Sequence, residues 1–125
     1  MDLYIDLHRN AANMQRAKND VAILDGQRTA RMFFVVGTGL TANDDSGETA
    51  NWRENYALAL FLTKRLRDTN TELAKDIRVK QKVYNQDLGR CLLAEIGHNA
   101  NLLTDAENTV PYLAEAIAAA FGLTD

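Results

Sequence analysis

The feature that most constrains the fold is a set of short apolar runs, each too brief to form a helix. They cover residues 3–7, 32–36 and 91–97. The second run is almost continuously apolar, which is typical of a strand covered on both faces. Polar residues bound the first run, and a single carboxylate, Glu95, interrupts the third. We therefore expect a short buried strand at each of the three places.

Residues 21–37 predict a hairpin. Its turn is Asp25-Gly26, a pair that favours tight turns because glycine adopts a positive φ without steric cost. We expect Met32 to Val36 to form the second arm. A further short strand is expected near 77–79.

Two longer segments predict helices. The first begins at Trp52, after a candidate cap at Asn51 or Thr49. The second lies within 104–122, with candidate caps at Thr104 or Asp105. Because proline lacks an N–H group, we expect the regular part of this helix to start near Pro111.

This order of elements predicts an α/β fold in a single domain over residues 1–125. We expect three layers: a mixed sheet with parallel central strands, flanked by helices. Strand 91–97 should be central and parallel to strand 3–7. No element precedes strand 3–7 to cover it, so we expect the domain to lack its N-terminal part.

Composition excludes some functions. The chain has 14 Lys and Arg against 17 Asp and Glu, with a net charge of −3, and no basic stripe that would favour nucleic acid. Its one cysteine, Cys91, cannot form an internal disulfide, and we expect a small buried side chain there. No apolar run reaches the roughly 18 residues of a membrane span, and we do not expect the first residues to be a signal peptide, because they lack a basic n-region.

Candidate chemistry lies where strands 3–7 and 91–97 end, because ligands of open α/β sheets bind beyond the carboxyl ends of strands. His8 follows the first strand, Glu95 lies within the other, and His98 comes just after it. A histidine and a glutamate on neighbouring parallel strands can reach one metal ion or one water molecule. A carboxylate inside an apolar strand is also expected to have a raised pKa.

Each of these residues also has a structural interpretation. His8 can be a hydrogen-bonded residue at a strand end, and His98 a loop residue. Glu95 can form a salt bridge with Arg9 or Arg90. Asp6 points to the face opposite Leu7 and can meet Arg53 or Arg31. The polar residues of 84–89 can form a turn or line a groove.

Several ordered motifs then resemble a known family. The chain contains YIDLHRNAA, FFVVGTG, NWRENYALAL, YNQDLGRCLLAEIG and TVPYLAEAIA, in an order and spacing similar to the stage II sporulation protein P family. These are cell-wall hydrolases of endospore-forming bacteria, similar in turn to zinc N-acetylmuramoyl-L-alanine amidases of α/β fold. The resemblance spans essentially the whole chain.

The resemblance implies roles for individual residues. His8 matches a zinc-binding histidine, and Glu95 matches the catalytic carboxylate that activates water and protonates the leaving amine. The remaining matched residues are expected to be supports or substrate contacts: Arg9, Asn85, Gln86 and Asp87. A second histidine and a glutamate that bind zinc in the family have no counterpart here. His98 is a candidate replacement ligand, and Asn10 replaces an expected aspartate.

These expectations leave three functional hypotheses. The first is a zinc-dependent amidase and endopeptidase acting on peptidoglycan, membrane-associated and outside the cytoplasm as the family resemblance implies. The second is a non-catalytic domain that keeps the amidase fold and binds cell wall or a protein. The third, compatible with both, is a homodimer in which a second copy covers strand 3–7.

Overall fold

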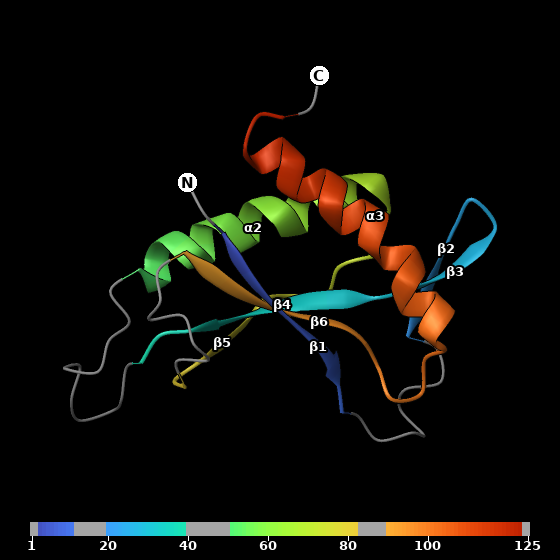
Figure 1. Cartoon of the computed structure of the whole chain (residues 1–125), viewed down its shortest axis with the longest axis horizontal. Coiled ribbons are helices and arrows are strands. Elements are labelled where there is room, and N and C mark those ends of the chain that lie inside the picture. The colour runs from blue at the N-terminus through green and yellow to red at the C-terminus, as the bar shows by residue number, and fades with distance from the viewer. Residues whose placement is uncertain (1–2, 12–19, 40–50, 83–89, 124–125) are drawn as a thin grey trace.

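A computed structural model describes residues 3–11, 20–39, 51–82 and 90–123 of the chain, and every structural statement below concerns these residues (Figure 1). Its elements are, in chain order, β1 (Tyr4–Asn10), β2 (Val21–Leu24), β3 (Gln27–Ala30), β4 (Met32–Gly37), α2 (Trp52–Thr69), β5 (Arg78–Lys80), β6 (Cys91–His98) and α3 (Leu103–Ala120).

The main sheet has the strand order β1-β6-β4-β5. Strand β6 is parallel to β1 and antiparallel to β4, whereas β4 and β5 are parallel. The α/β class, the mixed sheet and the interior, parallel placement of the strand around 91–97 are therefore confirmed. The short strand expected near 77–79 lies one residue later, at Arg78–Lys80.

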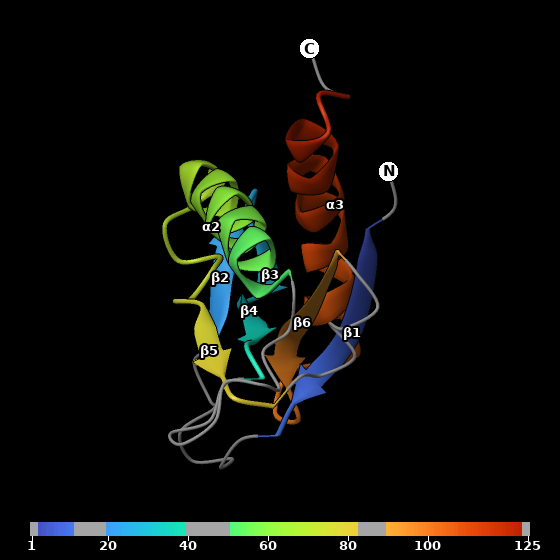
Figure 2. The same ribbon diagram turned by 90° about the vertical axis from the view of Figure 1, so that its left-hand side faces the viewer.

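Both described helices lie on one face of this sheet (Figures 1 and 2). Three layers were expected, whereas among the described residues one layer of helices covers one face of the main sheet. Strands β2 and β3 form a separate two-stranded sheet. Side chains alternate along a strand, so every second residue of β4 and β6 faces the helices. Together with residues of both helices, these side chains form the main core, which includes Met32, Phe34, Val36, Leu92, Ala94 and Ile96 of the strands and Leu62, Leu66 and Leu113 of the helices.

The alternate residues point to the other face of the sheet, away from the helices. Phe33, Val35 and Leu93 form a separate buried cluster there, each at most 6% exposed. Strand β4 is thus buried on both sides, as its continuous apolar sequence predicts. Cys91 is also buried and is a free thiol, as expected.

The strand at 3–7 was expected to be buried, and this is wrong. Strand β1 is an edge strand of the described sheet (Figure 2). Tyr4 is 52% exposed and Leu7 is 59% exposed. Its apolar residues resemble those of an interior strand, and a single strand carries no signal of how many neighbours it has.

The expected hairpin turn at Asp25-Gly26 is confirmed. Both residues have positive φ, 51° and 77°, as a two-residue type I′ turn requires. The second arm is wrong, however, because β2 pairs with β3, which ends at Ala30. Met32–Gly37 instead joins the main sheet, where its apolar side chains are covered on both faces.

Helix α2 is confirmed, and Asn51 holds its N-cap position without a side-chain capping bond. The start predicted for the last helix is wrong. Helix α3 begins at Leu103 and continues through Pro111. The Asp105 carboxylate accepts a hydrogen bond from the Leu102 N–H at 3.1 Å and so fixes the helix start well before the proline. Glu107, whose carbonyl loses its helical donor to the proline, is exposed and can bind water.

Candidate functional site

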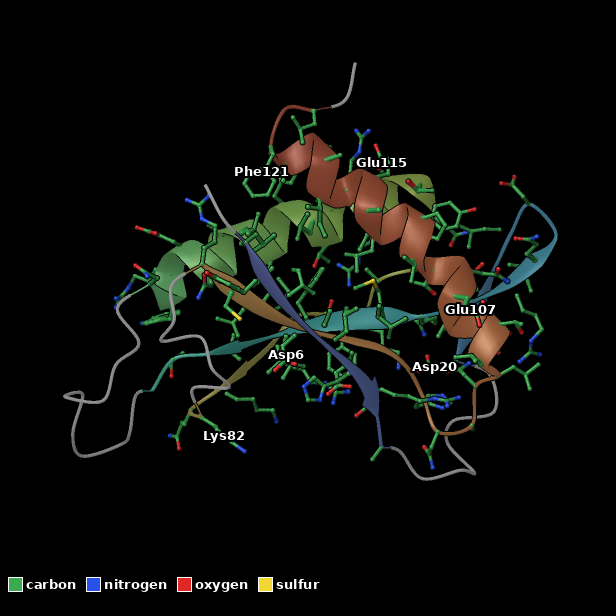
Figure 3. The ribbon with its side chains drawn as sticks, viewed as in Figure 1. Asp6, Asp20, Lys82, Glu107, Glu115 and Phe121 are labelled. Carbon is green, nitrogen blue, oxygen red and sulfur yellow. The ribbon has the colours of Figure 1, made fainter. Side chains whose placement is uncertain are left out.

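His8 and Glu95 lie side by side on the face of the sheet that the helices leave open. They are register partners in the parallel pair of β1 and β6, as are Asp6 and Leu93. Register partners of a parallel pair project to the same face, so Asp6, His8 and Glu95 share the face of the Phe33 cluster. Figure 3 labels Asp6 on this side. The structure thus brings together the histidine and the carboxylate that the sequence singled out.

The imidazole of His8 is held by its strand neighbour two residues before it. His8 Nε2 lies 2.9 Å from Asp6 Oδ1, and the two side chains are 46% and 33% exposed. An ionised carboxylate can only accept, so Nε2 donates to an ionised Asp6, and in the neutral imidazole this leaves Nδ1 with its lone pair. A carboxylate that orients a histidine through one ring nitrogen is typical of metal-binding histidines.

Glu95 sits in surroundings that disfavour its charge. Its Oε2 atom is buried and has no hydrogen-bond partner among the described residues. Burial raises the pKa of the Glu95 carboxyl above its ordinary value, although the charges of His8 and Arg78 act in the opposite direction. A carboxylate with a raised pKa and a free oxygen is suited to accept a proton from water.

Phe33 and two cations form the wall beside this pair. Phe33 is the register partner of Glu95 on β4. The Arg78 guanidinium lies 4.1 Å from the centre of the Phe33 ring, and Lys75 Nζ lies 5.9 Å from it. An apolar ring with positive charge above it both desolvates the neighbouring carboxylate and leaves the site attractive to anionic groups.

Arg9 supports the end of β1. Its Nε donates to the His98 carbonyl at 2.8 Å, and its Nη2 donates to the Asn101 carbonyl. The guanidinium therefore ties β1 to the turn between β6 and α3, and it is not the partner of Glu95. Asp6 likewise bonds His8, whereas Arg31, one of the partners considered for it, contacts Asp20 and Glu72.

His98 is 2% exposed. Its Nδ1 accepts a hydrogen bond from the Ala100 N–H at 3.1 Å. Its Nε2 has no hydrogen-bond partner among the described residues and lies 3.4 Å from Asp20 Oδ2. Asp20 also pairs with Lys75 and lies 3.6 Å from Arg31. The ring is thus part of a buried ionic cluster, which favours its structural interpretation.

The described residues offer an incomplete donor set for zinc. A catalytic zinc site has three protein ligands and one open position. His8 Nδ1 and the unpartnered Glu95 oxygen suit such a site, but no group of three or more metal-ligating side chains occurs in the described part of the chain. The described residues by themselves therefore do not fit a complete zinc centre. Asn85, Gln86 and Asp87 lie outside the described residues.

Sequence reasoning missed that Asp6 is the partner of His8, and that Arg78 and Phe33 flank Glu95. The first was detectable, because residues two apart on a strand share a face. The second depended on strand order, since β5 enters the sheet beside β4 and β4 places Phe33 opposite Glu95.

Together, fold and site define an α/β protein with a histidine–carboxylate pair on the open face of a mixed sheet. A family model described as Stage II sporulation protein P (SpoIIP) matches residues 1–118, and the chain belongs to this family. Membership implies, in general terms, a sporulation-related cell-wall hydrolase role. No curated protein and no solved structure matches the chain. None of the helices in the described part is long and apolar enough to cross a membrane.

Proposed function

We propose that this chain carries the catalytic carboxylate of a peptidoglycan hydrolase, acting as an N-acetylmuramoyl-L-alanine amidase and endopeptidase in septal wall degradation during sporulation. The observation that supports this most is the register pairing of His8 with Glu95 on the open face, where Glu95 Oε2 lacks a described partner. Family membership supplies the link to the cell wall.

In this proposal Glu95 moves the proton. It accepts a proton from the attacking water and passes it to the nitrogen that leaves when the amide bond breaks. The raised pKa of Glu95 suits both steps, since a stronger base takes the proton more readily and the resulting acid still releases it to an amine. Arg78 lies on the same face and can attract a carboxylate of the peptide substrate.

His8 is the proposed zinc ligand, through Nδ1, while Asp6 fixes its ring. When bound, zinc would supply Lewis-acid activation of water. Since Glu95 moves the proton and the described residues give one ligand, His8, the remaining ligands must come from residues outside the described part of the protein.

The proposed substrate is peptidoglycan, and the proposed location is outside the cytoplasm and associated with a membrane. Arg9 acts as a support, and Asn85, Gln86 and Asp87 are proposed as supports or substrate contacts.

The incomplete donor set favours one alternative, a non-catalytic domain that retains the amidase fold and binds cell wall or a protein partner. Such a domain would bind purified cell walls without releasing soluble fragments, and substitution of Glu95 would leave that binding unchanged.

The experiment that tests the proposal follows fragment release from purified cell walls, together with zinc binding by calorimetry on metal-free protein. We expect His8→Ala to abolish both activity and zinc binding. Asn99→Ala, an exposed substitution in the turn after β6, is the control and should change neither. Wall hydrolysis that persists in His8→Ala would contradict the assignment of His8.

A further inference from the structure

Strand β5 brings an exposed cation, Arg78, onto the open face of the main sheet. Arg78 is the register partner of Val35 on β4, and Val35 belongs to the buried cluster of the open face together with Phe33. Register partners project to the same face, so Arg78 lies on the side of Glu95. Strand β5 is the strand farthest from β1 in the described sheet (Figure 2). The open face therefore carries a carboxylate on β6 and a guanidinium that comes from β5.

The Arg78 side chain turns toward Glu95. Phe33 faces Glu95 across the pair of β4 and β6, and the guanidinium carbon of Arg78 lies 4.1 Å from the centre of the Phe33 ring. Neighbouring strands lie roughly 4.8 Å apart, so a group above Phe33 is about one strand spacing from the position of Glu95. Burial raises the pKa of Glu95, and the charges of His8 and Arg78 oppose that rise, as expected of cations close to it.

The N–H donors of Arg78 are not used within the described part of the chain. Its guanidinium makes no hydrogen bond or ion pair with another described residue. Stacking on Phe33 uses the flat face of the guanidinium and leaves the N–H groups at its edge for a bidentate pair with a carboxylate. Other arginines donate to a carbonyl or a carboxylate, namely Arg9, Arg28, Arg31, Arg65 and Arg67.

The charged groups nearest to Arg78 do not take up its charge. Glu95 Oε2 is buried and has no hydrogen-bond partner among the described residues, so Arg78 does not bond it. Lys75, the other cation beside Phe33, is already paired with Asp20. Arg78 is therefore placed to bind an anion that does not belong to the described residues.

We propose that Arg78 binds a free carboxylate of the peptide stem, and so selects stems in which this group is not amidated. The inference rests on the proposed function, because it takes peptidoglycan as the substrate and places the scissile amide at Glu95. An extended peptide advances by about 3.5 Å per residue, so a carboxylate one or two residues from that amide reaches the guanidinium. A carboxamide at the same place lacks the charge and turns N–H donors toward the donors of Arg78.

The test compares two dipeptides that differ in one group, by NMR titration. They are N-acetyl-L-alanyl-D-glutamate and N-acetyl-L-alanyl-D-isoglutamine, each with its γ-carboxyl capped as a methylamide. We expect the wild type to bind the carboxylate form about tenfold to a hundredfold more tightly, as for a hydrogen-bonded charged group. Arg78→Gln should bind both forms equally. Arg78→Lys, which keeps the charge without the planar fork, should show a smaller preference than the wild type.

Arg53→Gln is the matched control. Arg53 also stacks on an aromatic ring, at 4.6 Å from the centre of Trp52, but both residues belong to α2 on the other side of the sheet. This variant loses the same charge and the same kind of contact, and it should keep the preference of the wild type.

The wild-type comparison does not depend on how any variant folds. Equal affinity for the two dipeptides, or binding of neither, would overturn the proposal, and so would a preference that persists in Arg78→Gln. Glu95→Gln separates this proposal from the proposed function, because it should keep the preference while wall hydrolysis is lost. A wild type that shows the preference but releases no fragments from cell walls would contradict the hydrolase function and support the assignment of Arg78.

Discussion

The two faces of the main sheet are formed by the same strands but differ in their side chains: one packs against the helices, and the other carries Glu95. On β6, Leu92, Ala94 and Ile96 face the helices and lie in the main core. Their neighbours Leu93 and Glu95 face the other way, toward His8 and Phe33. One face therefore supplies most of the apolar burial that stabilises the fold, and the other can hold a poorly solvated carboxylate. Strand alternation separates the two roles by a single residue.

Two carboxylates, Asp105 on the helix side and Glu95 on the open face, differ in their hydrogen-bond partners and in the direction of their pKa shifts. Asp105, at the start of α3, is 1% exposed but fully partnered. Arg28 donates to both of its oxygens, at 3.1 and 3.0 Å, and the Leu102 N–H donates at 3.1 Å. These bonds lower the pKa of Asp105, whereas burial raises the pKa of Glu95. The surroundings of Asp105 therefore favour its ionised form, whereas those of Glu95 disfavour it.

The largest expected effect is a difference in the free energy of unfolding between alanine variants of two adjacent leucines, Leu92 and Leu93. Leu92→Ala should lower the free energy of unfolding by about 2–5 kcal/mol, because it removes a fully buried side chain from the main core. Leu93→Ala, on the open face, should cost less, because its cluster has only three members. Urea unfolding of the two variants makes the comparison. Equal losses would mean that the open face contributes as much packing as the helix face.

The next effect compares the two carboxylates. Asp105→Asn should lower the free energy of unfolding by about 1–3 kcal/mol, because it weakens the bond to Arg28 and disturbs the start of α3. Glu95→Gln should leave stability at neutral pH unchanged or slightly raised, since it removes a desolvated charge. Thermal unfolding of both variants is the measurement. A larger loss in Glu95→Gln would show that Glu95 is a structural ion.

The smallest effect is the pH dependence of each residue, and the signs are opposite. The pKa of Asp105 is lowered from 3.8 on folding, so its stabilisation is present above that pH and is lost as pH falls through the folded pKa. The pKa of Glu95 is raised from 4.5 on folding. The contribution of Glu95 to stability is therefore highest below pH 4.5, and it declines as pH rises through the folded pKa. Unfolding measured at several acidic pH values checks both signs. In Asp105→Asn the loss of stability as pH falls should be smaller, and in Glu95→Gln the loss of stability as pH rises should disappear.

Local patterns were sufficient for much of the fold. The apolar run around Glu95 predicts its strand, Asp25-Gly26 predicts its turn, and the placement of His8 beside Glu95 followed from two strands expected to be parallel. What failed depended on tertiary context. An apolar run does not reveal that β1 is an edge strand, and local turn chemistry does not reveal that the arm after Gly26 ends at Ala30.

The site shows the same limit. Glu95 was conspicuous as a lone carboxylate in an apolar strand, and its raised pKa agrees with that reading. His98 was equally conspicuous beside it, yet its ring belongs to a cluster with Asp20, a residue far away in sequence. Arg78 carried no local signal, because only the strand order brings β5 near β6.

Cell-wall hydrolysis by Glu95→Gln tests whether the open face is catalytic. We expect a loss of activity of about 10²–10⁴-fold, the effect of removing a general base, with unfolding unchanged. Glu107→Gln, an exposed carboxylate of α3 on the other side of the sheet, is the control and should retain full activity. Full activity in Glu95→Gln would show that Glu95 is not the catalytic carboxylate.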